Sequence, residues 1–159
     1  CANPVPEIWP HAAKEEGAFI VATGRGDFPN QVNNSVCFPG ILKGALAVRA
    51  RKITDAMAIR CAHSLADFAR KRGITPDNIV ATMSETEVFA YEAADVAMQA
   101  IADGVARVET TWQAVYDKAM ADITASRNMT KDLMAMGYIK EPPMEMLEKT
   151  LEEAIAEVR

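Results

Sequence analysis

One stretch, residues 23–40, most constrains what this chain can fold into. It reads TGRGDFPNQVNNSVCFPG and holds three glycines, two prolines and three asparagines. Such residues set unusual backbone angles and offer amide hydrogen bonds instead of apolar bulk. A short apolar run, residues 18–22, precedes the stretch, and a helix-like pattern, residues 41–50, follows it. Because ligands bind where a buried strand of an open α/β sheet leads into a helix, this stretch predicts a binding loop.

Composition and charge limit the class of protein. The 159 residues suit one ordinary domain with a core, and 50% hydrophobic with 25% charged residues is typical of a globular chain. The formal net charge of -5 and the pI near 5.1 argue against nucleic acid as a partner, because phosphate binding needs concentrated Lys and Arg. No apolar run approaches the length of a membrane span. We therefore expect neither a nucleic-acid nor a membrane partner.

The cysteines and histidines show no ligand pattern in the sequence. Cys1, Cys37 and Cys61 are odd in number, far apart and outside metal-ligand spacing. The sequence therefore indicates neither a disulfide framework nor a zinc site, and a reducing cytoplasm fits best. His11 and His63 have no second ligand at helical spacing, so we interpret them as structural or exposed.

The first residues carry an α/β pattern. The chain opens at Cys1 without an initiator Met, as though cut within a strand, and we interpret it as a fragment. Asn3, which precedes Pro4, is expected just past the end of a strand. A short helix over residues 9–16 and a strand over residues 18–23 follow, and together they predict half of a parallel unit.

From there on the pattern is almost wholly helical. Thr54 predicts an N-cap, Ser84–Glu87 predicts a capping box, and Gly104 and Gly137 predict helix ends. Residues 74–83 can form a strand or only a buried connection. The predicted helices cover residues 40–49, 54–72, 88–103, 112–136 and 144–158. The fold class is therefore α/β and predominantly helical.

The loop also carries a family resemblance. Together with CANPVPEI at the start of the chain, TGRGDFPNQVNNSVCFPG resembles the malic enzymes of the bacterial and archaeal type, which oxidise and decarboxylate malate to pyruvate. The likeness continues through FPGILKGALAVRA, EVFAYEAADVAMQAIADGVAR and SRNMTKDLMAMGYI, up to the break at Pro142 and Pro143. The resemblance implies three parts: 1–33 as the tail end of a Rossmann-like NAD(P)-binding domain, 34–108 as a helical segment packing with the substrate domain, and 109–159 as a carboxyl-terminal helical tail.

The resemblance implies an orienting role for three asparagines. Asn3, Asn33 and Asn34 match the family asparagines that line the cleft between the two domains and contact malate and the nicotinamide. An amide can donate to a carboxylate and accept from a hydroxyl without adding a charge. Gly26 stands where the family pattern has a serine, so a hydroxyl contact is not expected there.

The resemblance places the remaining chemistry outside this chain. The family's acid/base Tyr and Lys, its acidic ligands for Mg or Mn, and its glycine-rich dinucleotide turn all precede the matching region. We therefore expect no catalytic residue and no metal ligand here, and Tyr91, Tyr116 and Tyr138 are not given those roles. Gly24-Arg25-Gly26 lacks a third glycine at the required spacing and is interpreted as a bend. The implied cofactor is NAD or NADP, and the sequence does not separate the two.

The residues alone leave other interpretations open. Asn33 and Asn34 can be a turn pair, because asparagine tolerates left-handed backbone angles. The chain can also be a non-catalytic helical interaction or oligomerisation module. The apolar stripe of residues 144–158 would then contact another subunit, and we expect a homo-oligomer, a dimer. In a third interpretation Cys1 is the amino-terminal nucleophile of a hydrolase.

Overall fold

The computed structural model describes residues 4–158, with Val158 given by its backbone alone. It divides into two compact units, Cys1–Ala121 and Asp122–Arg159. Within the described residues, every buried side chain lies in the first unit. That unit therefore holds the hydrophobic core and, with it, the means to position a site.

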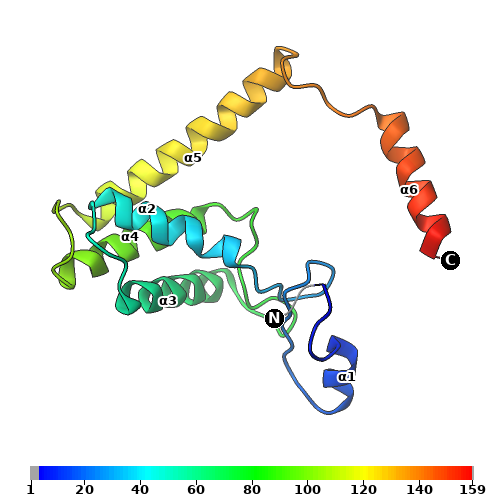
Figure 1. Ribbon diagram of the computed structural model, residues 1–159, viewed down its shortest axis with the longest axis horizontal. Helices are drawn as coiled ribbons and strands as arrows, with labels where there is room; N and C mark the ends of the chain where they lie inside the picture. The colour runs from blue at the N-terminus through cyan, green and yellow to red at the C-terminus, as the bar shows by residue number, and fades with distance from the viewer. Residues whose placement is uncertain (1–3, 159) are drawn as a thin grey trace. The chain divides into compact units, whose positions relative to one another are not determined.

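Three helices form the core of the first unit. α2 (Phe38–Ala47) and α3 (Asp55–Arg72) both pack against α4 (Glu87–Ala102), as Figure 1 shows. α4 presents small side chains to its neighbours, with Ala90, Ala93, Ala94, Ala97 and Ala100 all buried. Short side chains let helix backbones approach closely, and Gly44 of α2 lies at such a close approach to α4. A Cβ added there would lie 2.5 Å from the carbonyl oxygen of Ala93.

A fourth helix contributes only its first turns to the core. α5 (Trp112–Ala135) begins in the first unit, where Val115 and Ala119 join the core. The Trp112 ring stacks on Tyr116 at 5.1 Å, and its Nε1 donates a hydrogen bond of 2.8 Å to Asp95 of α4. These contacts fix the start of α5 against α4.

The observed helix boundaries largely confirm those predicted from the sequence. Thr54 caps α3 by accepting a hydrogen bond of 3.1 Å from the Met57 amide, and Gly104, at φ +67°, follows the end of α4. The predicted capping box at Ser84–Glu87 is wrong, because Thr86 stands at the N-cap of α4 without a side-chain bond. Instead the Thr82 amide donates to the Glu85 carboxylate at 2.8 Å, one turn earlier. Thr82 and Glu85 thus have the spacing of a capping box, two residues before the predicted pair of Ser84 and Glu87.

The predicted strand over residues 18–23 is wrong for this chain. Among the described residues the structure contains only isolated bridges, Thr23 with Gln31 and Thr75 with Asn78. A strand is stable only where neighbouring strands satisfy its amide and carbonyl groups, and residues 18–22 find no such partner here. Phe19 is accordingly 77% exposed. Residues 74–83 form a connection and no strand, but the connection is mostly exposed and Ala81 is its one buried residue, so the predicted burial is wrong.

The remaining helices are α1, η1 and α6. α1 (Pro10–Glu15) and the short 3-10 helix η1 (Asn34–Val36) belong to the first unit, and α6 (Met144–Val158) to the second. Along α6, Leu147, Leu151 and Ile155 are all exposed, so the predicted helix and its apolar stripe are present. None of the helices in the described part of the chain combines the length and apolarity that crossing a membrane requires.

Candidate functional site

The loop of residues 23–40 is organised by Asn30, a residue that the sequence did not single out. Asn30 is buried and has φ of 57°, the left-handed region that asparagine tolerates. Its Nδ2 donates to the carbonyl oxygens of Val21 at 3.0 Å and Pro76 at 2.7 Å, and its Oδ1 accepts from the Ile79 amide at 2.9 Å. One amide side chain therefore ties the loop to the segment before it and to the connection that leads to α4.

Arg25 fixes the first turn of the loop. Its guanidinium donates to both carboxylate oxygens of Asp27, at 2.8 and 2.6 Å, and lies over the rings of Trp9 and Phe28. The pairing with Arg25 holds the pKa of the Asp27 carboxyl below its usual value. Because the Arg25 guanidinium is paired with the Asp27 carboxylate, its charge stabilises the conformation of the loop.

The paired asparagines lie at the start of η1. Asn33 is half-buried and accepts a hydrogen bond of 2.9 Å from the Ser35 amide, which makes it the N-cap of η1. Asn34 is exposed. Asn33 has φ of -122°, and neither asparagine of the pair has a positive φ, so the left-handed turn left open for this pair is not observed. The Nδ2 group of Asn33 is the part of its amide that can donate to a ligand. Asn3 and Cys1 lie outside the described residues.

A pocket of about 500 Å³ opens between the loop and the connection to α4. Gly26 and residues 28–31 line one side, and residues 77–78 and 80–84 line the other. Its polar groups are mainly amides and hydroxyls, which suits a ligand held by neutral hydrogen bonds. Asn33 and Asn34 are not among the lining residues.

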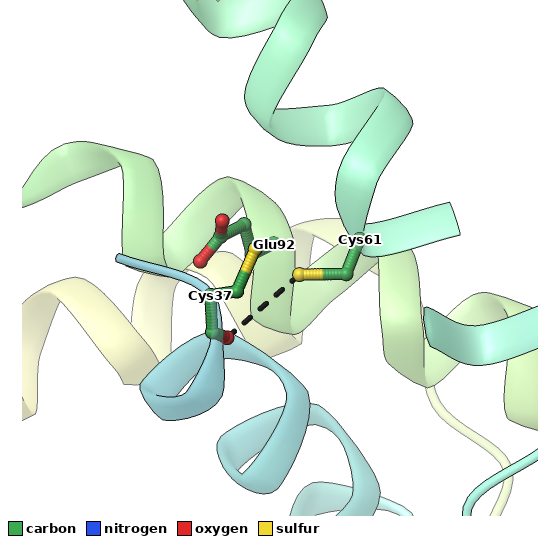
Figure 2. A group of neighbouring side chains, drawn as sticks. All are labelled: Cys37, Cys61 and Glu92. Carbon is green, nitrogen blue, oxygen red and sulfur yellow. Dashed lines mark hydrogen bonds between the residues drawn. The ribbon is translucent and has the colours of Figure 1, made fainter. Parts of the chain in front are cut away.

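A second group of side chains converges where the loop enters α2. Cys37 is the N-cap of α2, Cys61 lies on α3 and Glu92 on α4, and Figure 2 shows the three meeting. The two Sγ atoms and a carboxylate oxygen all lie within 4.8 Å of one another, and the Cys61 thiol donates to the Cys37 carbonyl oxygen at 3.8 Å. The sequence spacing indicated neither a disulfide nor a zinc site, yet the fold brings Cys37 and Cys61 together. Sequence spacing misses the group because three helices supply it.

Burial and the hydrogen bond between the two thiols set the electrostatics of this group. Burial raises the pKa of Glu92 to about 9, and the neighbouring Cys37 adds to the rise. Hydrogen bonding with Cys61 lowers the pKa of the half-buried Cys37 thiol to about 7. Hydrogen bonding with Cys37, together with burial, raises the pKa of the Cys61 thiol. With its pKa that high, the Glu92 carboxyl holds its proton at neutral pH. Among the two thiols, Cys37 is the one that ionises first.

The sequence predicted no ligands for Mg or Mn in this chain, and the candidate metal ligands that meet in the fold bear on that prediction. Hard divalent ions bind six or more oxygen atoms, including water. In the described range, Cys37, Cys61 and Glu92 form the single group of three or more candidate ligands, and two of these are thiols. The group does not fit Mg or Mn.

Tyr91 and Tyr116, both in the first unit, do not line the pocket beside the loop. Tyr91 and Tyr116 belong to an aromatic cluster with Trp112, and the Tyr116 hydroxyl donates to Glu87 at 2.7 Å. Tyr138 is exposed, in the second unit.

Comparison with known proteins identifies the family. A sequence model described as "Malic enzyme, NAD binding domain" matches residues 18–102, more than half of the chain. The chain belongs to this family. The match includes the loop of residues 23–40 and all of α2, α3 and α4, so the malic enzyme resemblance carried by the sequence motifs is confirmed.

Solved structures and curated relatives agree with the assignment to the malic enzymes. The malic enzyme of Entamoeba histolytica is 64% identical, with a TM-score of 0.93, over 99% of this chain and 33% of that one. The malic enzyme from Pyrococcus horikoshii is 44% identical, with a TM-score of 0.78, over 82% of this chain and 30% of that one. The "Bifunctional malic/malolactic enzyme" of Bacillus subtilis is 42% identical over 117 residues, which are 74% of this chain and 28% of the relative. The chain spans about a third of the length of these malic enzymes, or less.

Proposed function

We propose that this chain is part of an NAD(P)-dependent malic enzyme that oxidatively decarboxylates malate to pyruvate. The observation that carries the proposal is the family match over residues 18–102, which includes the complete loop. Relatives named as NAD-dependent, from Geobacillus stearothermophilus, and as NADP-dependent, from Halomonas elongata, match at 40% and 38% identity. The preference between NAD and NADP therefore stays open within the proposal.

In this proposal the chain supplies orientation, and the chemical groups come from elsewhere in the enzyme. Asn33 and Asn34, with Asn3, hold the malate carboxylate and hydroxyl and the nicotinamide side of the cofactor. Support comes from the position of Asn33 and Asn34 on one short turn just before α2, and from the neutral donors and acceptors that amides offer. A neutral donor binds a dicarboxylate without the cost of burying a second charge.

The reaction that these residues would orient has two steps. Hydride leaves C2 of malate for the nicotinamide while a base takes the hydroxyl proton, which gives a ketone. The carboxylate next to that ketone then leaves as carbon dioxide, and an acid protonates the resulting enolate. We place the base, the acid and the ligands of Mg or Mn outside this chain, because the resemblance puts them before the matching region. The group of Cys37, Cys61 and Glu92 contains two thiols and does not fit Mg or Mn.

The proposal also assigns three segments of the chain to domains of the enzyme. Residues 1–33 end a Rossmann-like domain, residues 34–108 pack with the substrate domain, and residues 109–159 form the helical tail. The exposed apolar side chains of residues 18–22 support the first assignment, because a strand there would need neighbours in a parallel sheet. The thiols of Cys37 and Cys61 are free, as a reducing cytoplasm would keep them.

We further infer a homo-oligomer, a dimer, in which α6 contacts another subunit. Leu147, Leu151 and Ile155 recur at helical spacing and are 44%, 62% and 47% exposed. An apolar stripe of this kind on one helix is typical of a subunit contact.

The proposal is tested by malate-dependent reduction of NAD or NADP in the protein of full natural length. Asn34→Ala is expected to lower kcat/KM roughly 10- to 100-fold, because loss of a buried neutral hydrogen bond costs about 1–3 kcal/mol. Since Asn34 is exposed in this structure, the melting temperature should not change. Asn128→Ala, at an exposed asparagine of α5, is the matched control and should keep full activity.

Two outcomes would contradict the proposal at different levels. If the unaltered protein reduces neither nucleotide in the presence of malate, the proposed activity is wrong. If that activity is present but Asn34→Ala keeps the original kcat/KM, the activity stands and the role of the asparagine is wrong.

A further inference from the structure

The group of Cys37, Cys61 and Glu92 is built from three separate helices. Its ligand atoms lie within 4.8 Å of one another, although Cys61 and Glu92 are 31 residues apart in the sequence. Figure 2 shows their side chains pointing into one shared space. Gly40 helps to make that space, because a Cβ there would lie 2.4 Å from Oε2 of Glu92. The packing of α2 on α4 thus leaves room for the carboxyl group.

Glu92 is the member of the group that its protein surroundings leave incomplete. Its side chain is 0% exposed, and both carboxyl oxygens are buried without a hydrogen-bond partner. An unpartnered buried polar group costs free energy, and buried carboxyl groups in folded proteins are normally paired, hydrogen-bonded or bound to a metal. The surroundings of Glu92 offer chiefly two sulfur atoms, which are weak hydrogen-bond partners but strong metal ligands.

We propose that Cys37, Cys61 and Glu92 form a binding site for a thiophilic divalent metal ion, with Zn²⁺ as the ion that fits best. Two thiolates and one carboxylate make a mixed sulfur and oxygen set that tetrahedral zinc accepts. Two thiolates on such an ion lie about 3.8 Å apart, so the side chains need to close by roughly 1 Å at most from their present separation.

The arrangement also provides access and a suitable charge. Cys37 is half-buried, so this residue is partly accessible to solvent. Three protein ligands leave the fourth position of a tetrahedral ion for water. Cys37 is the N-cap of α2, where the amide groups of a helix start favour a thiolate. When the ion binds, the thiol protons and any proton on Glu92 leave for solvent, and the ion takes their place as the counter-charge.

This inference is separate from the proposed malate chemistry. Hard Mg²⁺ or Mn²⁺ would not select two thiols, so this group favours a thiophilic ion. Its position gives it a structural consequence, because Cys37 follows Asn34 by three residues. A bound ion would tie the end of the loop to α3 and α4.

The test is a titration with Co²⁺ of the metal-free, reduced protein of full natural length, without malate or nucleotide. Co²⁺ reports on its ligands, since thiolate coordination gives charge-transfer absorption in the near ultraviolet. We expect one equivalent to bind with that absorption, Zn²⁺ to displace it, and a large excess of Mg²⁺ to leave it unchanged. Cys37→Ser and Cys61→Ser should each abolish or strongly weaken the absorption.

Glu92→Gln distinguishes the three-ligand site from a simple pair of thiols. It is expected to weaken binding by at least about tenfold, because the amide supplies no charge and is a poor ligand. Glu87→Gln makes the same carboxyl-to-amide replacement at an exposed position of the same helix and should leave the affinity unchanged. Absence of thiolate-to-cobalt absorption in the unaltered protein overturns the site, and equal affinity of the Glu92→Gln and unaltered proteins removes Glu92 from it.

A second measurement needs no variant and so does not depend on a variant's folding. Iodoacetamide should modify the half-buried Cys37 in the metal-free protein, and peptide mass analysis can locate the modified residue. One equivalent of Zn²⁺ should slow that modification at least about tenfold, since a coordinated thiolate is no longer a free nucleophile. An unchanged rate of Cys37 modification in the presence of Zn²⁺ would overturn the proposal.

Discussion

The helical core and the segment that precedes it are stabilised by different interactions. Where α2 meets α4, glycine and alanine allow close approach, and the buried side chains are almost all apolar. In residues 18–33, Phe19, Ile20 and Val32 are exposed, and the segment is held by the polar side chain of Asn30. Burial of apolar surface stabilises the first region, and a few hydrogen bonds stabilise the second.

This difference determines which substitutions each region tolerates. The core should be sensitive to added volume, because close-packed interiors cannot expand without strain. The preceding segment should be insensitive to apolar truncation and sensitive to loss of a single amide. Each side of the comparison can be tested by a change in the free energy of unfolding, measured by chemical denaturation.

The largest effect is expected for Gly44→Val in α2. The added Cβ would lie 2.5 Å from the Ala93 carbonyl oxygen and 2.8 Å from the Val96 Cβ, and a backbone oxygen cannot move aside. We expect a loss of about 3 kcal/mol or more, at the upper end of overpacking effects. Ala47→Val adds methyl groups to an exposed position of the same helix and should cost less than about 1 kcal/mol. A loss for Gly44→Val no larger than that of the control would show that α2 and α4 are further apart than described.

A smaller effect is expected for Asn30→Gly. Glycine keeps the left-handed backbone angle and removes the three side-chain hydrogen bonds, so the variant isolates the contribution of the amide. We expect a loss of about 2 kcal/mol, because buried partner groups are left unsatisfied. Asn30→Ala should cost roughly 1 kcal/mol more, since alanine is strained at positive φ. Equal stability of Asn30→Gly and the unaltered chain would mean that these bonds do not hold the segment.

The sequence predicted the helices because their signals are local. The periodicity of residues 54–72, the cap at Thr54 and the glycine after α5 all act within a few residues of the helix ends. The strand over residues 18–23 could not be judged in the same way. Its apolar run is a valid strand signal, but pairing depends on neighbours that sequence pattern does not supply.

The candidate site was predictable only where a motif is contiguous. Asn33 and Asn34 stand in the loop motif, so the resemblance names them, and their ligand role stays a prediction. The group of Cys37, Cys61 and Glu92 instead forms through tertiary packing. A usable signal existed for Glu92, which stands between Val88 and Val96 at the four-residue spacing of a buried helix face. A carboxylate on a buried helix face is unusual, and the alanines around Glu92 indicate that this face is buried. The sequence could therefore have marked Glu92 as a candidate site residue. For Asn30 the signal was weaker, because asparagine after proline is common in ordinary turns.

The smallest effect is expected for Phe19→Ala in the 159-residue chain. Phe19 is 77% exposed, so its truncation should change the free energy of unfolding by less than about 0.5 kcal/mol. Val48→Ala, at a fully buried core position, should cost roughly 2 kcal/mol and provides the contrast. If Phe19→Ala costs as much as Val48→Ala, residues 18–22 are covered in solution and the two regions are not stabilised differently. In the protein of full natural length the expectation reverses. There the proposed function pairs residues 18–23 within a parallel sheet, and Phe19→Ala should cost about 3 kcal/mol because a buried aromatic side chain is lost.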